Sequence, residues 1–355
     1  MSDAERRYET LFPGDPAPWF RAACIGQAGS YSFDTAAGRF VVLCFYGDAA
    51  DPLARRALTA ARAQGALFAR LGVNLFGVSV SAADAADAAL APTLGQRHFH
   101  DVDGAISRAY GVAPQDGALD LAVLHRSWLV LDPRLRVVAR FALGEAGDAA
   151  TLALVRSLPS LSAHGAEAQV PVLTVPGVFE PEFCARLIDY HQATGGSDSS
   201  ILTEGATVSD HGFKSRRDRQ ITDKTLLAQT QTRIVRRVTP EIRHAFQFNA
   251  TRMERLIVAA YDAADGGRFG PHRDNTVAAA AHRRFAVSIN LNDDFEGGGI
   301  VFPEYSQRAF RPSLGGALIF SCALMHAVMP MTRGRRYACL PFVYDDAAAA
   351  LRRGG

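Results

Sequence analysis

The residues with the clearest chemical potential lie toward the C-terminal end of the chain. His272 and Asp274 are separated by one residue in the stretch GGRFGPHRD. In an extended segment, residues two apart point to the same face, so an imidazole and a carboxylate converge there. His326 follows in the apolar run ALIFSCALMHAVMP, and Arg336 comes soon after. Two histidines and one carboxylate that leave coordination positions open suit Fe(II), and a nearby arginine suits a carboxylate that accepts paired hydrogen bonds.

Histidines in apolar stretches also have a purely structural explanation. A lone histidine of this kind is more often a hydrogen-bonded core residue than a metal ligand. Here Asp274 beside His272, and Arg336 beyond His326, favour metal ligation by His272, Asp274 and His326. His282 lies in the stretch AAAAHRRF without such neighbours, and we do not expect it to be a ligand.

Residues from about 170 to 344 resemble the Fe(II)/2-oxoglutarate dioxygenase superfamily and, within it, the prolyl-4-hydroxylase-like branch. The matching residues follow in order along the chain: Tyr261, His272-Arg273-Asp274, Gly297-Gly298 before Val301-Phe302-Pro303, Gly315-Gly316, His326 and Arg336. The resemblance implies a double-stranded β-helix, or jelly roll, and a hydroxylase that uses Fe(II), 2-oxoglutarate and O2, with ascorbate as a further cofactor. It also implies that His272, Asp274 and His326 are the catalytic metal ligands.

Arg336 and Tyr261 are the residues that the resemblance assigns to binding of 2-oxoglutarate. Arg336 stands where prolyl-hydroxylase-like enzymes have a Lys or Arg for the distal carboxylate of this co-substrate. Tyr261 matches a tyrosine that assists the contact. On the sequence alone, Arg336 could instead be a surface residue like Arg333 and Arg335, and Tyr261 a core aromatic in a strand.

The carboxylate of Asp274 narrows the chemistry further. Related halogenases replace it by a small residue, which makes room for a halide, so its presence favours hydroxylation or another oxidation over halogenation. The resemblance permits an amino acid, a peptide or protein side chain, or a small metabolite as substrate. The polar stretch 195–223 is typical of a lid or binding loop. It contains four basic residues that either contact an acidic substrate or face solvent: Lys214, Arg216, Arg217 and Arg219.

The overall composition argues against several classes of protein. With 38 basic and 36 acidic side chains, the chain has a net charge of +2, which gives no basis for nucleic-acid binding. No stretch contains the roughly 20 uninterrupted apolar residues of a membrane span, and the first residues lack the apolar core of a signal peptide. Five scattered cysteines indicate buried thiols rather than disulfides or zinc ligands, and the expected location is the reducing cytoplasm.

The first half of the chain alternates strands with helices. Apolar runs at 39–46, 73–80, 127–131 and 136–141 predict strands, and the Ala- and Leu-rich segment 54–71 predicts a helix. Strand–helix–strand order predicts an α/β layer with a partly parallel sheet.

Over about residues 10 to 155 this half resembles the peroxiredoxins, which have a thioredoxin fold. The matching stretches are GDPAP, VVLCFYGDAADP, FGVSVS, HDVDGAISRAYGV and RSWLVLDPRLRVVARF. That family places its peroxide-attacking cysteine after Thr-Pro-x, whereas here Ala54 follows Asp51-Pro52-Leu53. A thiolate is what the chemistry requires. Arg126 stands where the family keeps an activating arginine, and Cys44 lies inside an apolar strand. We therefore expect a non-catalytic scaffold or partner-binding module.

The second half begins after a linker-like stretch and ends in a series of strands. Residues 157–171 are rich in Ser, Ala, Pro and Gly, a linker composition. Helical periodicity follows at 179–192, and a long helix at 222–246 is expected to break or bend near Pro240. The runs RLIVAAYD, FAVSINL, ALIFS and RYACLPFVY predict strands joined by turns, which suits an antiparallel jelly roll.

The predicted architecture is a two-domain chain. Residues 1–158 form the α/β, thioredoxin-like (peroxiredoxin-like) domain, residues 159–170 a linker, and residues 171–355 a double-stranded β-helix (jelly roll) with flanking helices. The expected partner is a small-molecule or peptide substrate, without nucleic acid or membrane. Because redoxin-like domains often form dimers, a homodimer stays open.

Two other functions compete with a hydroxylase. A redox or peroxide-sensing protein, or a thioredoxin-fold binding protein, would give the first domain the leading role, and Ala54 at the nucleophile position argues against an active peroxidase. A non-enzymatic binding protein with a dead oxygenase fold is argued against by the intact set His272, Asp274 and His326.

Overall fold

The computed structural model of the protein describes residues 7–164, 169–203, 206–208 and 210–351. These residues form two units, one built mainly from residues up to 168 and the other from residues 169–302 and from 307 onward. In the described part of the chain, no helix combines the length and apolar character needed to cross a bilayer.

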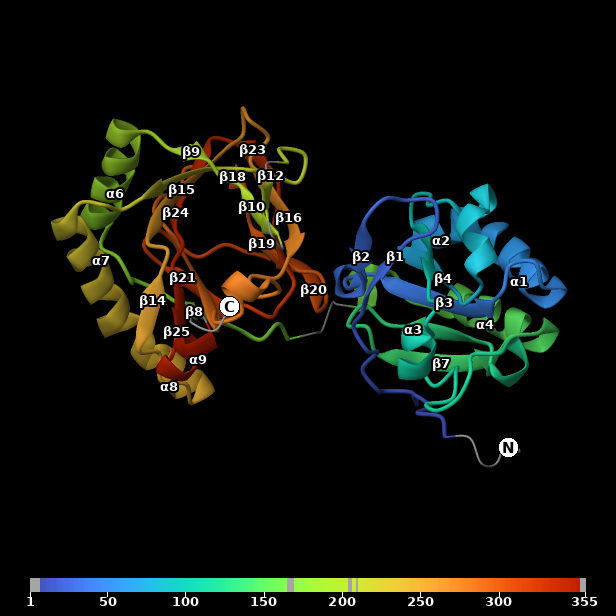
Figure 1. Cartoon of the computed structure of the whole chain (residues 1–355). Coiled ribbons are helices and arrows are strands. Elements are labelled where there is room, and N and C mark those ends of the chain that lie inside the picture. The colour runs from blue at the N-terminus through green and yellow to red at the C-terminus, as the bar shows by residue number, and fades with distance from the viewer. Residues whose placement is uncertain (1–6, 165–168, 204–205, 209, 352–355) are drawn as a thin grey trace. The chain divides into compact units, whose positions relative to one another are not determined.

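The first unit is an α/β layer around a five-stranded sheet with the order β5-β4-β3-β6-β7 (Figure 1). Its strands are β3 (Phe40–Gly47), β4 (Val73–Ser79), β5 (Gln96–His100), β6 (Ser127–Leu131) and β7 (Val137–Ala142). Strand β3 pairs in parallel with β4 and antiparallel with β6. All of β3 is buried, as expected for an apolar run that is covered on both faces. The predicted strands and the peroxiredoxin-like fold are confirmed.

The remaining elements of the first unit correct one prediction. The single helix expected at 54–71 is two helices, and the break coincides with Gly65, a weak helix former. The break allows Phe68 to turn into the core, where it is buried. The elements are α1 (Pro52–Arg62), α2 (Gly65–Leu71), α3 (Ala105–Ala109), α4 (Glu145–Ser157), the hairpin of β1 (Arg21–Ala23) and β2 (Ser30–Ser32), and 3-10 turns at Phe33–Ala36, Ala82–Ala86, Ala88–Leu90 and Leu121–Val123.

The N-terminus of α1 is where peroxiredoxins carry their cysteine, and here a carboxylate takes the available donors. Asp51 Oδ1 accepts hydrogen bonds from the backbone N–H of Leu53 at 2.9 Å and of Ala54 at 3.2 Å. Arg126 Nη1 forms an ion pair with the same oxygen at 2.9 Å. Burial raises the pKa of Asp51, but these donors outweigh it and hold the pKa below its ordinary value. Cys44 is fully buried, and burial raises the pKa of its thiol well above the usual range.

The second unit is a jelly roll of two antiparallel sheets, as predicted (Figure 1). The smaller sheet has the order β12-β16-β22-β19-β20. The larger one runs β14-β25-β17-β24-β15-β13-β9, with β21 beside β17 and β8 beside β21. The strands are β8 (Val172–Val175), β9 (Ser197–Asp198), β12 (Lys214–Ser215), β13 (Arg217–Gln220), β14 (Arg252–Glu254), β15 (Ile257–Asp262), β16 (Arg268–His272), β17 (Phe285–Asn290), β19 (Ile300–Phe302), β20 (Ser306–Phe310), β21 (Ala317–Ser321), β22 (His326–Val328), β24 (Arg335–Cys339) and β25 (Phe342–Tyr344). Two further two-stranded antiparallel sheets pair β10 (Ile201–Thr203) with β11 (Ala206–Val208), and β18 (Glu296–Gly297) with β23 (Met331–Arg333).

Alternation along β15 explains how the larger sheet is covered on both faces. Val258 and Ala260 belong to the core shared with the helices, whereas Ile257, Ala259 and Tyr261 belong to the core between the two sheets, as a period of two requires. The helices on the outer face include α6 (Pro181–Thr194), α7 (Lys224–Arg237) and α8 (Thr239–Phe246). The inner face of β15 therefore points at the smaller sheet.

Proline positions explain where the predicted elements divide. The helix expected at 222–246 breaks before α8, whose first turn contains Pro240, as the sequence indicated. The prediction of a single strand at 336–344 was wrong, because Leu340 and Pro341 separate β24 from β25. Proline has no N–H to donate to the hydrogen bonds between strands. Part of the linker is a short helix, α5 (Leu161–His164), and residues 165–168 lie outside the described part. The C-terminal helix is α9 (Asp346–Leu351).

Asp51→Ala is expected to lower the free energy of unfolding of the first unit by about 1 kcal/mol, the usual effect of losing an N-cap side chain. Both tryptophans of the chain, Trp19 and Trp128, lie in this unit, so urea unfolding followed by intrinsic fluorescence reports on it. Asp116→Ala is the matched control, since Asp116 is exposed. Equal stability of the two variants would contradict a capping role for Asp51.

Candidate active site

Strand pairing brings His272 and His326 face to face. They occupy opposing positions on β16 and β22, with an irregularity in the register between Phe269 and His272. Asp274 follows β16, and its backbone N–H donates to Cys322 O at 2.9 Å. His272 Nε2 lies 3.5 Å from Asp274 Oδ1, and His326 Nε2 lies 3.4 Å from Asp274 Oδ2. The ligand atoms of the three residues all lie within 4.8 Å of one another.

Hydrogen bonds to the backbone orient both imidazoles. His272 Nδ1 lies 2.9 Å from Gly270 O, and His326 Nδ1 lies 3.0 Å from Leu324 O. A carbonyl oxygen only accepts, so each Nδ1 carries the proton and each Nε2 presents a lone pair. Two lone pairs and a carboxylate then face one point, with the orienting contacts that metal-binding histidines usually have. The donor set fits a divalent cation.

The protonation states at neutral pH also suit a cation. Burial, together with the neighbouring His272, lowers the pKa of His326 to about 4. Burial raises the pKa of Asp274, but His326 and His272 outweigh it and hold that pKa below its ordinary value. The His326 imidazole is therefore neutral and the Asp274 carboxyl ionised.

Arg336 lies on the opposite sheet and differs from its neighbours. It faces Tyr261 in the register of β24 and β15, and only 2% of it is exposed. Its Nε donates to Asn290 Oδ1 at 3.0 Å and its Nη2 to Ser288 Oγ at 2.8 Å. Burial lowers its pKa to about 10, so it stays charged at neutral pH. Its hydrogen-bonded partners are neutral, so no carboxylate among them compensates this cation.

The two arginines next to Arg336 in sequence have other partners. Arg335 pairs with Asp262, and Arg333 pairs with Glu296, and both are exposed. The pairing of β24 thus separates one buried arginine from two surface arginines, a distinction that the sequence left open.

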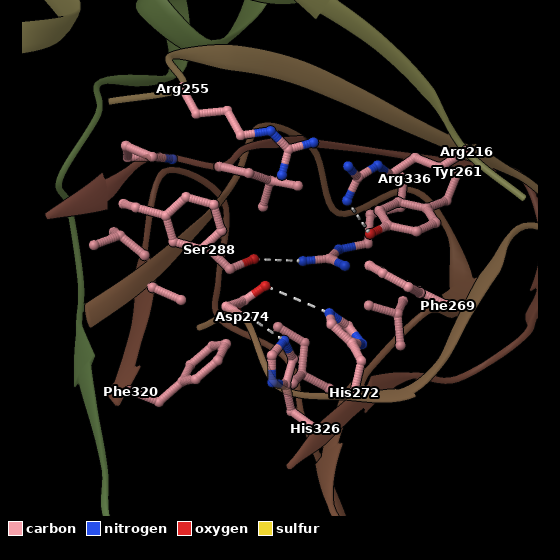
Figure 2. Close-up of a pocket in the computed structure, with 17 residues that line it drawn as sticks. Arg216, Arg255, Tyr261, Phe269, His272, Asp274, Ser288, Phe320, His326 and Arg336 are labelled. Atoms are coloured by element: carbon pink, nitrogen blue, oxygen red, sulfur yellow. Dashed lines mark hydrogen bonds and ion pairs between the residues drawn. The ribbon is translucent and has the colours of Figure 1, made fainter. Parts of the chain in front are cut away.

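The sheets form a pocket between these groups. Figure 2 shows His272, His326 and Asp274 converging on one side of it, and Arg336, Tyr261, Arg216 and Arg255 on the other. Apolar side chains form much of the remaining wall and keep water out. They include Phe269, Ile300, Phe320, Val328, Leu340 and Phe342.

Two arginines in the wall join the site from distant segments. Arg216 Nη1 donates to the Tyr261 hydroxyl at 3.0 Å, and its Nε lies 2.7 Å from Asp218 Oδ1. Arg255 Nη2 lies 3.0 Å from Asp218 Oδ2. Arg216 was one of four basic residues of undecided role; it and Lys214 are buried, whereas Arg217 is exposed.

Sequence reasoning missed Arg255 and Ser288. Nothing in the sequence around Arg255 indicates a cavity. For Ser288 the sequence did contain a signal. Ser288 and Asn290 are two residues apart on an otherwise apolar strand, so their side chains point to the same face of the sheet. His282 lies outside the three-residue cluster, and its Nε2 is 2.9 Å from Glu254 Oε2.

The chain is similar to two protein families. Residues 256–344 match the model of the 2OG-Fe(II) oxygenase superfamily, and residues 13–140 match that of the AhpC/TSA family. A PKHD-type hydroxylase of Pseudomonas putida is 23% identical over 194 residues, which are 51% of this chain and 83% of the relative. A PKHD-type hydroxylase of Synechococcus elongatus is 25% identical over 149 residues, 39% of this chain and 65% of that relative.

Solved structures are similar to each half separately. A Pseudomonas putida prolyl-4-hydroxylase has a TM-score of 0.38 at 17% identity and covers 53% of this chain and 100% of its own. Peroxidoxin BcpB from Mycobacterium tuberculosis has a TM-score of 0.37 at 21% identity and covers 42% of this chain and 99% of its own.

The second unit thus contains a match to the 2OG-Fe(II) oxygenase superfamily, and the first contains a match to the AhpC/TSA family with Ala54 at the position of the peroxidatic cysteine. Both the oxygenase match and the PKHD-type relatives support a 2-oxoglutarate-dependent hydroxylase, with a redoxin-like domain in the same chain. Its superfamily implies Fe(II), 2-oxoglutarate and O2 as the groups that the cavity must accept.

Asp218→Asn is expected to destabilise the second unit by about 3 kcal/mol, because it leaves Arg216 and Arg255 without their shared counter-charge. Burial raises the pKa of Asp218, but the two arginines outweigh it and hold that pKa below its ordinary value. The stabilisation is thus fully present above the unfolded pKa, near 4, and is lost as the pH falls through the folded pKa.

Calorimetric unfolding at several pH values measures this effect. The matched control is Asp198→Asn, since Asp198 is exposed and lies 4.0 Å from Arg217. A difference between the two variants that stays constant as the pH is lowered would contradict the assignment.

Proposed function

We propose that His272, Asp274 and His326 bind Fe(II) and that the chain hydroxylates a C–H bond of its substrate. In this reaction 2-oxoglutarate, O2 and R–H give succinate, CO2 and R–OH. One oxygen atom enters succinate and the other enters the hydroxyl group. The observation that carries the proposal is the convergence of two oriented Nε2 lone pairs and one ionised carboxylate.

Bound Fe(II) supplies the activation of O2, and the protein supplies placement and electrostatics. Three protein ligands leave positions open for the co-substrate and O2. The Asp274 carboxylate lowers the charge of the metal site by one unit. The apolar wall of the cavity limits access of water to the reacting groups.

Arg336 and Tyr261 would bind the distal carboxylate of 2-oxoglutarate. The guanidinium of Arg336 is buried and has only neutral partners, so a carboxylate would supply the missing counter-charge. The Tyr261 hydroxyl accepts a hydrogen bond from Arg216, and arginine cannot accept. The hydroxyl proton of Tyr261 is thus available to a carboxylate oxygen. Ser288, which also accepts from an arginine, is oriented in the same way.

The family relationship supports an amino acid, a peptide or protein side chain, or a small metabolite as substrate. Ascorbate belongs to the proposal only through the resemblance to prolyl-4-hydroxylases. The relatives are PKHD-type hydroxylases, and the chain covers between two fifths and five sixths of their lengths.

Peroxide sensing by the first unit is the less favoured function. Asp51 occupies the donors at the N-terminus of α1 and also pairs with Arg126. No thiol is available there, since Ala54 stands at the nucleophile position. A peroxide-consumption assay distinguishes the two functions. An active peroxidase would consume peroxide, and Ala54 cannot supply the attacking thiolate for that reaction.

Anaerobic loading with Fe(II) is expected to give one bound iron per chain and slow succinate formation from 2-oxoglutarate in air, without added substrate. His326→Ala and Asp274→Ala should lose both properties, because each change removes one of the three protein ligands. His244→Ala is the control, since His244 is exposed on α8. Succinate formation that survives chelation, or the Asp274→Ala substitution, would refute the iron site.

Arg336→Lys is expected to weaken 2-oxoglutarate binding about ten- to a hundred-fold with iron retained. Lysine keeps the charge but loses the planar fork of donors, and a hydrogen bond to a charged group contributes roughly 1.5–3 kcal/mol. Arg336→Ala should weaken 2-oxoglutarate binding further, because the buried carboxylate of the co-substrate would then have no paired cation. The dependence of succinate formation on 2-oxoglutarate concentration measures both effects.

Arg333→Ala and Arg335→Ala are the matched controls for this experiment, since their side chains lie at the surface. If either change weakened 2-oxoglutarate binding more than Arg336→Ala at equal iron content, the co-substrate arginine would be a different one.

A further inference from the structure

Arg255 lines the active-site cavity but has no part in the proposed binding of Fe(II) and 2-oxoglutarate. Figure 2 shows its side chain extending into the cavity along the wall opposite the histidines. In the described part of the chain, its hydrogen-bonded partner is Asp218 alone, through Nη2 at 3.0 Å. A guanidinium carries five N–H donors, so most of those on Arg255 are available. The side chain is 30% exposed, which leaves it accessible to a ligand.

Every guanidinium nitrogen of Arg216, the other arginine on Asp218, already has a partner. Its Nη1 donates to the Tyr261 hydroxyl, its Nη2 to Asp218 at 2.7 Å and to Ser199 Oγ at 3.1 Å, and its Nε is paired with Asp218. Arg216 thus positions Tyr261 and Asp218. Arg255 is the one of the pair with donors left for a ligand.

The charges around the cavity do not balance after the co-substrate is bound. Arg216 and Arg255 share one carboxylate, Asp218, so this group carries one positive charge. Arg336 adds a second, and Fe(II) with Asp274 adds one more, which makes three. The dianion 2-oxoglutarate removes two of them. One positive charge remains in a largely apolar enclosure, where Coulomb interactions are strong, and this favours a substrate with a single negative charge.

The backbone of Arg255 is also held in an uncommon conformation. Its φ is 59°, in the left-handed region that favours glycine. It lies at the corner between β14 and β15. Strained residues of this kind concentrate at ligand-binding sites. The arginine therefore stands where glycine would fit the backbone better, which points to a use for its side chain.

The surroundings of Arg255 favour an organic anion over an inorganic one. Its guanidinium carbon lies 5.8 Å from the centre of the Phe342 ring. Leu340 and Pro341 also line the cavity. A ligand that contacts Arg255 would thus place a carboxylate on the guanidinium and an apolar body against these side chains.

We propose that Arg255 binds a carboxylate of the substrate and that this substrate is a small organic monocarboxylate. The inference rests on the proposed function, because the charge count includes Fe(II) and 2-oxoglutarate. It narrows the substrate to molecules with a free carboxylate near the carbon to be hydroxylated. An acidic side chain of a peptide has the same chemistry, and the test distinguishes the two sources.

The test is calorimetric titration of the full-length protein loaded with Mn(II), in place of Fe(II), and 2-oxoglutarate. The probes are propionate, butyrate and benzoate, their neutral amides, and an N-acetylated, C-amidated tetrapeptide with one glutamate. We expect at least one of the three carboxylates to bind, its amide not to bind, and the peptide to bind more weakly.

Arg255→Gln is expected to weaken binding of that carboxylate at least ten-fold. Arg255→Gly should do the same, and because glycine adopts the left-handed backbone readily, added backbone strain would not explain its loss. Arg252→Gln is the matched control and should bind as the unaltered protein does, since Arg252 is exposed and pairs with Asp346.

Each other outcome overturns a distinct claim. If Mn(II) or 2-oxoglutarate does not bind, the proposed function fails and this inference with it. If both bind but no carboxylate does, or the amides bind equally well, the inference alone fails. Tighter binding of the peptide would assign the site to a protein substrate. Weaker 2-oxoglutarate binding in Arg255→Gln, with carboxylate binding unchanged, would move Arg255 to the co-substrate.

Discussion

The pairing of β16 with β22 is the constraint on which the candidate site depends. It sets His272 opposite His326, and the hydrogen bond from Asp274 N to Cys322 O holds the carboxylate beside them. Side chains alternate with a period of two, so a slip of one residue would turn one imidazole away from the cavity. The irregularity in the register before His272 is therefore part of the site, since it fixes which residues face inward.

The opposite wall depends on a different physical factor, the burial of positive charge. Arg336 has neutral hydrogen-bonded partners, and Arg216 and Arg255 share one carboxylate. Burying cations without full compensation is unfavourable unless a counter-ion arrives. The cavity therefore favours anions, because a ligand carboxylate would offset the unfavourable free energy of burying these guanidinium charges. The metal side and the anion side face each other because the two sheets of the jelly roll do.

The first unit has the sheet and helices of a peroxiredoxin-like fold, with Ala54 at the position of the reactive cysteine. Asp51 takes the donors of α1 and the charge of Arg126, so the local structure is stabilised by an internal anion. The Asp51 carboxylate accepts hydrogen bonds from the backbone N–H groups at the N-terminus of α1, and a thiolate at this position would use the same positive end of the helix. A scaffold role for this unit stays a prediction.

The sequence by itself determined the two fold classes, the absence of a peroxidatic thiol and the residues of the candidate metal site. These rest on local periodicity, on the spacing of residues, and on motifs that resemble those of two known families. The domain boundaries at 158 and 171, the cytoplasmic location and a homodimer stay predictions. Only the tertiary structure decided which of three adjacent arginines is buried, and that Arg216 and Arg255 join the cavity. Their directions depend on strand register and on a left-handed corner at Arg255, and such long-range pairings leave no mark in the local sequence.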